Sequence, residues 1–179
     1  NLEQVSYGIL LWRALLQWLG GIGIIVMAVA ILPMLSIGGM QLFKTESYET
    51  PDKIIPRAAI FASGISIVYI VLTSTWAFML WLAGMPIFDS ITHAMTTLAT
   101  GGYSTKSESL GAFNSVNIEM IIVFGMIVGS LPFIHYLSIL KNGWKNLIND
   151  QQVKWFLLIL FFLISIVTFN LYINGQNFF

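Results

Sequence analysis

The chain has 179 residues, of which 57% are hydrophobic and only 9% are charged, against about 25% charged residues in an average soluble domain. Its eight basic and eight acidic residues cancel to a net charge of zero, so it lacks the basic excess of a nucleic-acid-binding protein. So few polar side chains cannot cover a soluble globule, and so apolar a chain is not intrinsically disordered.

Charged residues are absent from four long stretches of the chain. These stretches contain 30, 31, 21 and 25 residues and cover 14–43, 58–88, 120–140 and 155–179. A helix needs about 20 mostly apolar residues to cross the hydrocarbon core of a membrane. The sequence therefore predicts an all-α, polytopic membrane protein. Because the chain begins with Asn1 and ends on an apolar run, we interpret it as a piece of a longer protein.

The first predicted membrane-spanning helix covers about 14–37. Trp18 near its start is typical of an aromatic anchor at the membrane interface. We expect Arg13, just before this helix, to anchor at the outer interface, with a role on the pore side as the alternative. Three glycines that favour close packing against another helix lie in its first half: Gly20, Gly21 and Gly23.

Three further spans are predicted at about 58–82, 117–140 and 155–173. Three basic residues lie in each of the polar loops 44–57 and 141–154, whereas the long segment between the second and third spans has only Lys106. Basic residues of short loops stay on the cytoplasmic side of a membrane. We therefore expect both polar loops to be cytoplasmic and 83–116 to lie on the periplasmic side.

The segment between the second and third spans contains a predicted helix, 89–98, that is too short to cross a membrane. Asp89 or Ser90 is a suitable N-cap, and ten helical residues rise only about 15 Å. The following run, 99–105, favours extended or left-handed backbone. A short helix and a glycine turn between two spans are typical of a re-entrant loop. The alternative is that Gly101 and Gly102 only cap an external helix.

A re-entrant loop of this kind would suit a dehydrated monovalent cation. The carbonyl end of the short helix is the negative end of its macrodipole and would point towards the membrane centre. The residues that follow would present backbone carbonyl oxygens to the ion, and Thr100 could add its hydroxyl. No formal charge is required.

Four segments of the chain resemble the Trk/Ktr/HKT potassium transporter superfamily, above all its bacterial TrkH/TrkG members. Residues 96–105, with the sequence TTLATGGYST, are similar to the second pore loop of that superfamily. Residues 12–23, WRALLQWLGGIG, resemble the start of the helix after its first pore loop. The segments 81–85 and 113–115 also fit.

The resemblance implies a fold of helix–pore loop–helix repeats, four of which surround one pore. In this fold, 1–43 is the second helix of a preceding repeat, and 44–57 is a cytoplasmic loop. Residues 58–140 form a complete repeat with pore helix 89–98 and filter 99–105. A second cytoplasmic loop, 141–154, leads to the first helix of the next repeat, 155–179.

The same resemblance implies K⁺ uptake through a selectivity filter. The filter glycine of the family corresponds to Gly102, with neighbouring carbonyls from Thr100, Gly101 and Tyr103 and K⁺ itself at Thr100 and Gly101. Potassium would be the transported ion, and the chain itself would bind no cofactor. A Na⁺-permeable member of the superfamily and a non-conducting membrane scaffold or assembly subunit are the alternatives.

The resemblance also implies the surroundings of the protein. We expect it in the bacterial inner membrane, in contact with lipid, as a homodimer of the full-length protein. A cytosolic regulatory subunit that binds nucleotide would dock on the cytoplasmic loops, and nucleic acid is not expected as a partner.

Four other residues carry weaker expectations. Asp89 and His93 are one helical turn apart and are expected to support the loop, whereas Glu119 would attract cations at the outer mouth or lie among the lipid headgroups. His135 is expected at the membrane interface, with gating or proton sensing as the alternative. An intramembrane hydrolase is disfavoured because the motifs G-x-S-x-G and H-E-x-x-H are missing, so we do not expect an enzyme.

Overall fold

The computed structural model describes residues 2–35, 51–143 and 145–174, and every regular element within these ranges is a helix. The chain divides into two compact units, Asn1–Phe133 and Ile134–Phe179, which are taken separately below. Three helical segments are long and apolar enough to cross a membrane, namely Tyr7–Ile24, Ala62–Leu82 and Gln151–Ile173. The protein is thus an all-α membrane protein.

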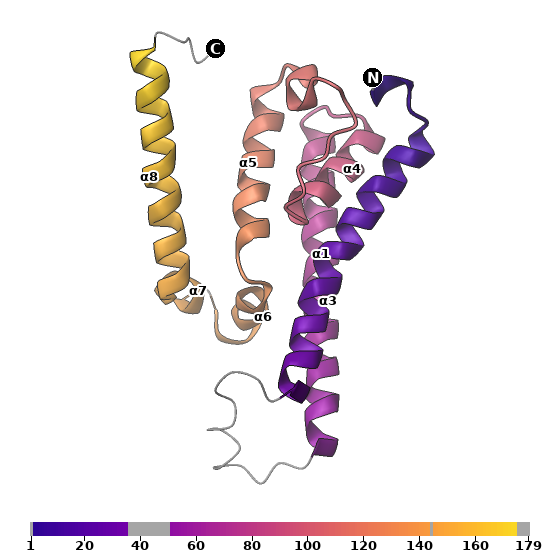
Figure 1. The fold of residues 1–179 in the computed structure, drawn as a ribbon, viewed down its shortest axis with the longest axis vertical. Coiled ribbons are helices and arrows are strands. Elements are labelled where there is room, and N and C mark those ends of the chain that lie inside the picture. Colours follow the sequence, from indigo (N-terminus) through magenta and orange to yellow (C-terminus); the bar gives the residue numbers. More distant parts are fainter. Residues whose placement is uncertain (1, 36–50, 144, 175–179) are drawn as a thin grey trace. The chain divides into compact units, whose positions relative to one another are not determined.

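The first unit is built around a short helix packed among three longer ones (Figure 1). The long helices are α1 (Tyr7–Leu35), α3 (Pro51–Leu82) and α5 (Val116–Ser130), and the short helix is α4 (Ile87–Leu98). Helix α4 contacts all three. The unit also contains two 3₁₀ turns, η1 (Leu2–Gln4) and η2 (Ser109–Phe113).

Helices α1 and α3 are joined by polar contacts within their apolar surfaces. The Trp18 indole N–H donates to Thr73 Oγ1 at 3.0 Å, and the Tyr69 hydroxyl donates to the Trp18 carbonyl at 3.2 Å. The two rings stack with centroids 5.2 Å apart. The one donor of Trp18 is therefore used against α3, and its placement at the membrane interface stays a prediction. Of the three glycines in this region, only Gly21 lies against neighbouring atoms.

A glycine turn separates α3 from α4. Gly84 has a φ of +97°, its N–H donates to the Trp81 carbonyl, and the Met85 N–H donates to the Leu80 carbonyl. This pair of bonds is the Schellman motif, in which the residue after the C-cap is left-handed and is usually glycine. The turn lets α4 fold back against the helix that precedes it.

Helix α4 begins two residues earlier than expected, at Ile87, with Pro86 as its N-cap. Neither Asp89 nor Ser90 caps it, which corrects that expectation. Both lie inside the first turn, where the Ser90 hydroxyl is within 3.1 Å of the carbonyls of Met85 and Pro86. Proline is tolerated at this position because the N–H that it lacks would have no partner within the helix.

The predicted third span, 117–140, is not one helix. Helix α5 ends at Ser130, and Leu131 is extended, with ψ 144°. Proline lacks an N–H and disfavours helical backbone in the residue before it, so Pro132 accounts for the break. Fifteen residues rise about 22 Å, which is less than the hydrocarbon thickness. The chain continues after the break in α6 (Phe133–Asn142).

The two polar segments also differ from simple loops. Residues 36–50 lie outside the described part of the chain, and α3 already begins at Pro51, where the fixed φ of proline suits the first helical position. In the second unit, 141–154 contains α7 (Lys145–Asn149) and the start of α8 (Gln151–Ile173). The Asp150 carboxylate caps α8 by accepting two backbone N–H groups at 2.7 and 3.2 Å.

Candidate functional site

The site begins where α4 ends, in a second Schellman motif. The Thr100 N–H donates to the Thr97 carbonyl at 2.9 Å, and the Gly101 N–H donates to the Thr96 carbonyl at 2.8 Å. The left-handed residue of this motif is Thr100, with φ +54°. A β-branched residue at positive φ is a genuine conformational outlier. The same motif at the end of α3 has glycine in this place, so the strain at Thr100 comes from the residue and not from the turn.

The two glycines after Thr100 are needed for different reasons. Gly102 has φ +72°, and a Cβ at this position would meet no atom within 4 Å, so only its backbone conformation excludes other residues. Gly101 has no such φ, but a Cβ there would overlap the side chain of Gln17 from α1. Ala99 is the C-cap of α4, Thr100 is the left-handed residue after it, and the Gly101 N–H completes the capping motif. Capping alone does not account for the positive φ of Gly102, which lies beyond this motif.

Three successive carbonyl oxygens at this turn are available to a ligand. Within the part of the chain that the structure describes, no hydrogen bond is received by the carbonyls of Thr100, Gly101 or Gly102. These residues line a hollow of about 270 Å³ together with Met126 and Ser130 of α5. Tyr103 differs, because its carbonyl accepts the Thr96 hydroxyl at 2.8 Å. Its carbonyl is therefore the least available of the four predicted ligands.

Buried polar side chains of α4 bind the segment that follows the turn, residues 103–106. The Thr105 hydroxyl donates to the Asp89 carboxylate at 2.5 Å, and His93 Nε2 lies 3.0 Å from the Ser104 hydroxyl. His93 Nδ1 lies 2.8 Å from the Asp89 carbonyl, which can only accept, so this nitrogen carries the proton. In the neutral ring Nε2 then accepts from Ser104, whose oxygen in turn accepts the Lys106 N–H at 3.0 Å. Asp89 and His93 thus contact the loop, each through its own partner.

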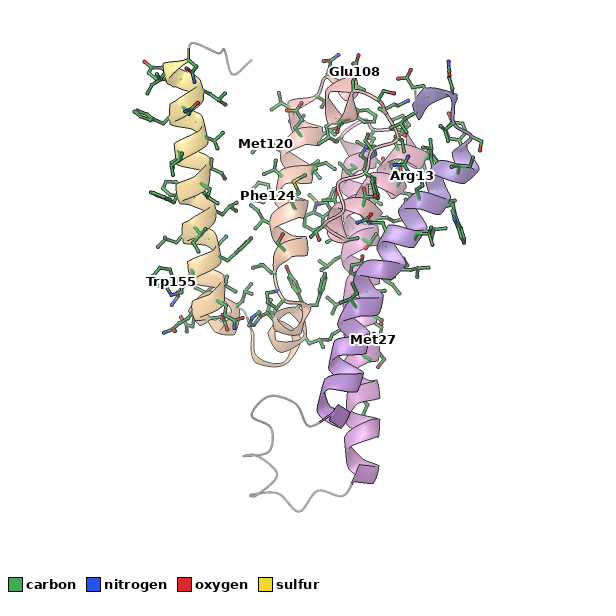
Figure 2. The ribbon with its side chains drawn as sticks, in the orientation of Figure 1. Arg13, Met27, Glu108, Met120, Phe124 and Trp155 are labelled. Atoms are coloured by element: carbon green, nitrogen blue, oxygen red, sulfur yellow. The ribbon has the colours of Figure 1, made fainter. Side chains whose placement is uncertain are left out.

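Arg13 lies beside the same loop. Its guanidinium carbon is 5.0 Å from the centroid of the Tyr103 ring, and Figure 2 shows it on the half of α1 next to the loop. The expectation of a simple interfacial anchor misses this contact. Sequence reasoning also missed Gln17 and Thr96. A polar residue four positions after Arg13 in an apolar run was the signal for Gln17.

The remaining predicted residues lie elsewhere. Glu119 is exposed in the first turn of α5, and none of the described contacts joins it to the loop. His135 belongs to the second unit, where its Nε2 lies 3.7 Å from an Asp150 carboxylate oxygen. Among the described residues, no group of three or more His, Cys, Asp or Glu could hold a metal ion.

Comparisons with known proteins match this chain to potassium uptake proteins over nearly its whole length. A family model described as TrkH, cation transport protein, matches residues 1–179. The chain is 42% identical over 171 residues to the Trk system potassium uptake protein TrkI of Halomonas elongata, which covers 94% of this chain and 34% of that protein. It is 39% identical to the Trk system potassium uptake protein TrkH of Salmonella typhimurium, over 98% of this chain and 37% of that relative.

A solved structure is also similar. The crystal structure of the potassium transporter TrkH from Vibrio parahaemolyticus matches with a TM-score of 0.74 at 37% identity, over 92% of this chain and 33% of that one. The chain thus spans about a third of the length of the relatives it matches.

Proposed function

Because this chain belongs to the TrkH family of cation transport proteins, we propose that it supplies one part of a K⁺-conducting pore. The turn 100–102 is its ion-coordinating segment. The observation that carries this proposal is the left-handed Thr100, which is followed by two glycines and precedes a run of carbonyls without hydrogen-bond partners. Strained backbone of this kind persists where a function retains it.

The chemistry follows from the position of these carbonyls at the end of α4. The twelve-residue helix places the negative end of its macrodipole at Thr100, next to carbonyls that replace the water around a dehydrated cation. A monovalent ion is stabilised by several such dipoles and can still leave, whereas a carboxylate would hold it more tightly. The Asp89 carboxylate accepts the Thr105 hydroxyl and so supports the segment that follows the turn, in place of serving as an ion ligand.

Potassium is the favoured ion because the relatives described above are named as potassium uptake proteins. A Na⁺-permeable relative would use the same carbonyls and differ in discrimination. A non-conducting scaffold has no use for Thr100 in a left-handed turn, since the glycine of the α3 turn makes the same motif without strain. The loop of this chain offers three free carbonyls, so other loops must complete the coordination shell.

The placement of the protein forms part of the proposal. We infer an inner-membrane location in which 83–116 faces the periplasm and the segments 44–57 and 141–154 face the cytoplasm, supported by the basic residues of these two segments. A homodimer, and a nucleotide-binding subunit docked on the cytoplasmic segments, follow from the family resemblance. Lipid would contact the exposed apolar side chains of α8.

Replacement of Gly102 by serine in the complete protein tests the ion-coordinating segment. A Cβ at φ +72° costs about 1–2 kcal/mol in this conformation, so the turn shifts and its carbonyls leave their positions. We expect the ratio of K⁺ to Na⁺ uptake in proteoliposomes to fall.

The matched control is Gly111→Ser. A Cβ on Gly111 would also enter open space, and this glycine has no positive φ, so uptake and selectivity should stay at the level of the unmodified protein. If Gly102→Ser left the K⁺/Na⁺ ratio unchanged, the assignment of the filter to this turn would be wrong.

A further inference from the structure

One face of α1 packs along the loop through a series of paired contacts. Arg13 lies over Tyr103, Gln17 lies against Gly101, and Gly21 lies against Ala99. The α1 residues are four apart, which places them on one side of a helix, and the loop residues are two apart. Because the numbering rises along one element as it falls along the other, the loop runs antiparallel to this face of α1.

The contacts differ in kind along this face. At one end, the Arg13 guanidinium lies over an aromatic ring, in a cation–π contact. In the middle, the Gln17 amide occupies the space that a Cβ of residue 101 would need, so the glycine has no room to move towards α1. At the other end, a Cβ at position 21 would lie 3.3 Å from the Ala99 Cβ, so the two backbones already approach closely.

Little space remains between α1 and the loop. The hollow lined by Leu10, Arg13 and Ala14 of α1 and by the polar residues of α4 and the loop measures only about 10 Å³, which is the room of roughly one water molecule. A wall packed this closely transmits a change of side-chain volume to the backbone it supports.

We propose that Arg13 and Gln17 are positioning residues that set the ion selectivity of the loop, acting through Tyr103 and Gly101. The proposal rests on the proposed function of the turn 100–102. If α1 is the second helix of a preceding repeat, as the family resemblance implies, each pore loop is then shaped by the repeat before it. The side chains of α4 hold the loop from one side, and α1 supplies the other.

A volume exchange between Gly101 and Gln17 tests the contact. Gly101→Ala in the complete protein should lower the K⁺/Na⁺ uptake ratio about tenfold, because the new methyl group displaces Gln17 or the turn. Gln17→Ala removes the three side-chain atoms nearest to the new methyl group. The double variant should therefore recover most of the lost discrimination, which an independent effect of the two changes would not produce. Gly111→Ala is the control.

Substitutions of Arg13 separate its contact with Tyr103 from its bulk. Arg13→Lys keeps a cation over the ring and should keep the uptake ratio within about threefold of the unmodified protein. Arg13→Met keeps much of the volume and loses the cation, so selectivity should fall while the melting temperature of the purified protein changes little. Phe in place of Tyr103 should preserve the contact, because the ring face and not the hydroxyl meets the guanidinium.

The outcomes distinguish this proposal from the one on which it rests. If Gly102→Ser alters selectivity and the Gly101→Ala defect is not relieved by Gln17→Ala, the filter assignment stands and the role of Gln17 is refuted. If Arg13→Met lowers uptake of both ions equally or only lowers the melting temperature, Arg13 is structural and its positioning role fails. If Gly102→Ser has no effect, the proposed function itself fails.

Discussion

Thr100 occupies a backbone conformation that its own side chain disfavours. Left-handed backbone costs a residue with a Cβ about 1–2 kcal/mol, and the chain avoids this cost at Gly84 in an equivalent turn. The cost of this backbone strain must be offset by an interaction that glycine, which has no side chain, cannot make. Under the proposed function the Thr100 hydroxyl is the candidate, because it would add a neutral ligand for a cation.

We therefore expect Thr100→Gly to separate stability from selectivity. Relief of the backbone strain should leave the free energy of unfolding unchanged or raise it by up to about 1 kcal/mol, after the entropy of glycine in the unfolded chain is subtracted. Loss of the hydroxyl should lower the K⁺/Na⁺ uptake ratio. Thermal unfolding of the purified protein and tracer uptake in proteoliposomes measure the two effects.

The converse change provides the comparison. Gly84→Thr introduces the same residue into the same motif, in open space, and should destabilise the protein by about 1–2 kcal/mol without changing selectivity. A Thr100→Gly variant that is less stable and equally selective would mean that Thr100 is retained for packing.

Local sequence patterns predicted part of the site, whereas its contacts between segments distant in sequence could not be predicted. The glycines at 101 and 102 mark the turn, although only Gly102 is explained by its backbone conformation and Gly101 is explained by the space that Gln17 takes. The spacing of Asp89 and His93 indicates support for the loop. Their partners, Thr105 and Ser104, could not be predicted from helical periodicity. These contacts form only because the segment after the turn runs back along α4.

At the scale of elements, α4 is wedged between three helices, and α5 meets it through glycine. A Cβ on Gly125 would overlap the Trp76 indole, and one on Gly129 would lie 2.9 Å from the Leu98 carbonyl oxygen. The two glycines are one turn apart, so they form a face on which the end of α4 rests. The Trp76 N–H donates to the Ile121 carbonyl at 2.9 Å and fixes α3 to the same face.

Gly129→Ala should disturb the end of α4 from the side on which α5 packs. Since the nearest atoms belong to the backbone of Thr97 and Leu98, no side chain can turn aside, and overpacking of this kind costs about 1–3 kcal/mol. We expect a lower melting temperature and reduced K⁺ uptake. Gly23→Ala, in the middle of α1 with nothing within 4 Å, should cause neither. Equal behaviour of the two variants would contradict the packing role of Gly129.

Helix boundaries were harder to predict than helix existence. Hydropathy alone makes 117–140 one span, because a window average does not register Pro132. The polar segment 141–154 was expected to be a loop, since its charges exclude it from lipid, yet charge does not prevent helix formation once Asp150 caps α8. Apolar length predicts that a helix is present, whereas caps and prolines decide where it stops.

At the scale of the whole molecule, the distribution of basic residues predicts the orientation in the membrane. Residues 1–179 contain no cysteine, so a cysteine introduced here is the single labelling site within this part of the protein. Glu108 (Figure 2) and Asn149 are both exposed. We expect a membrane-impermeant maleimide to label Glu108→Cys from the periplasm and Asn149→Cys only after the cytoplasmic side is opened. The reverse pattern would overturn the proposed topology.

Thr96 binds the proposed ion-coordinating turn at two points. Its carbonyl accepts the Gly101 N–H, and its hydroxyl reaches the Tyr103 carbonyl. The turn is therefore tied to one residue of α4 at two points, and a displacement of α4 together with α1 would carry it as a rigid body. Opening and closing of the pathway would then leave the spacing of its carbonyls intact, so that the ion preference should be the same in every conducting state.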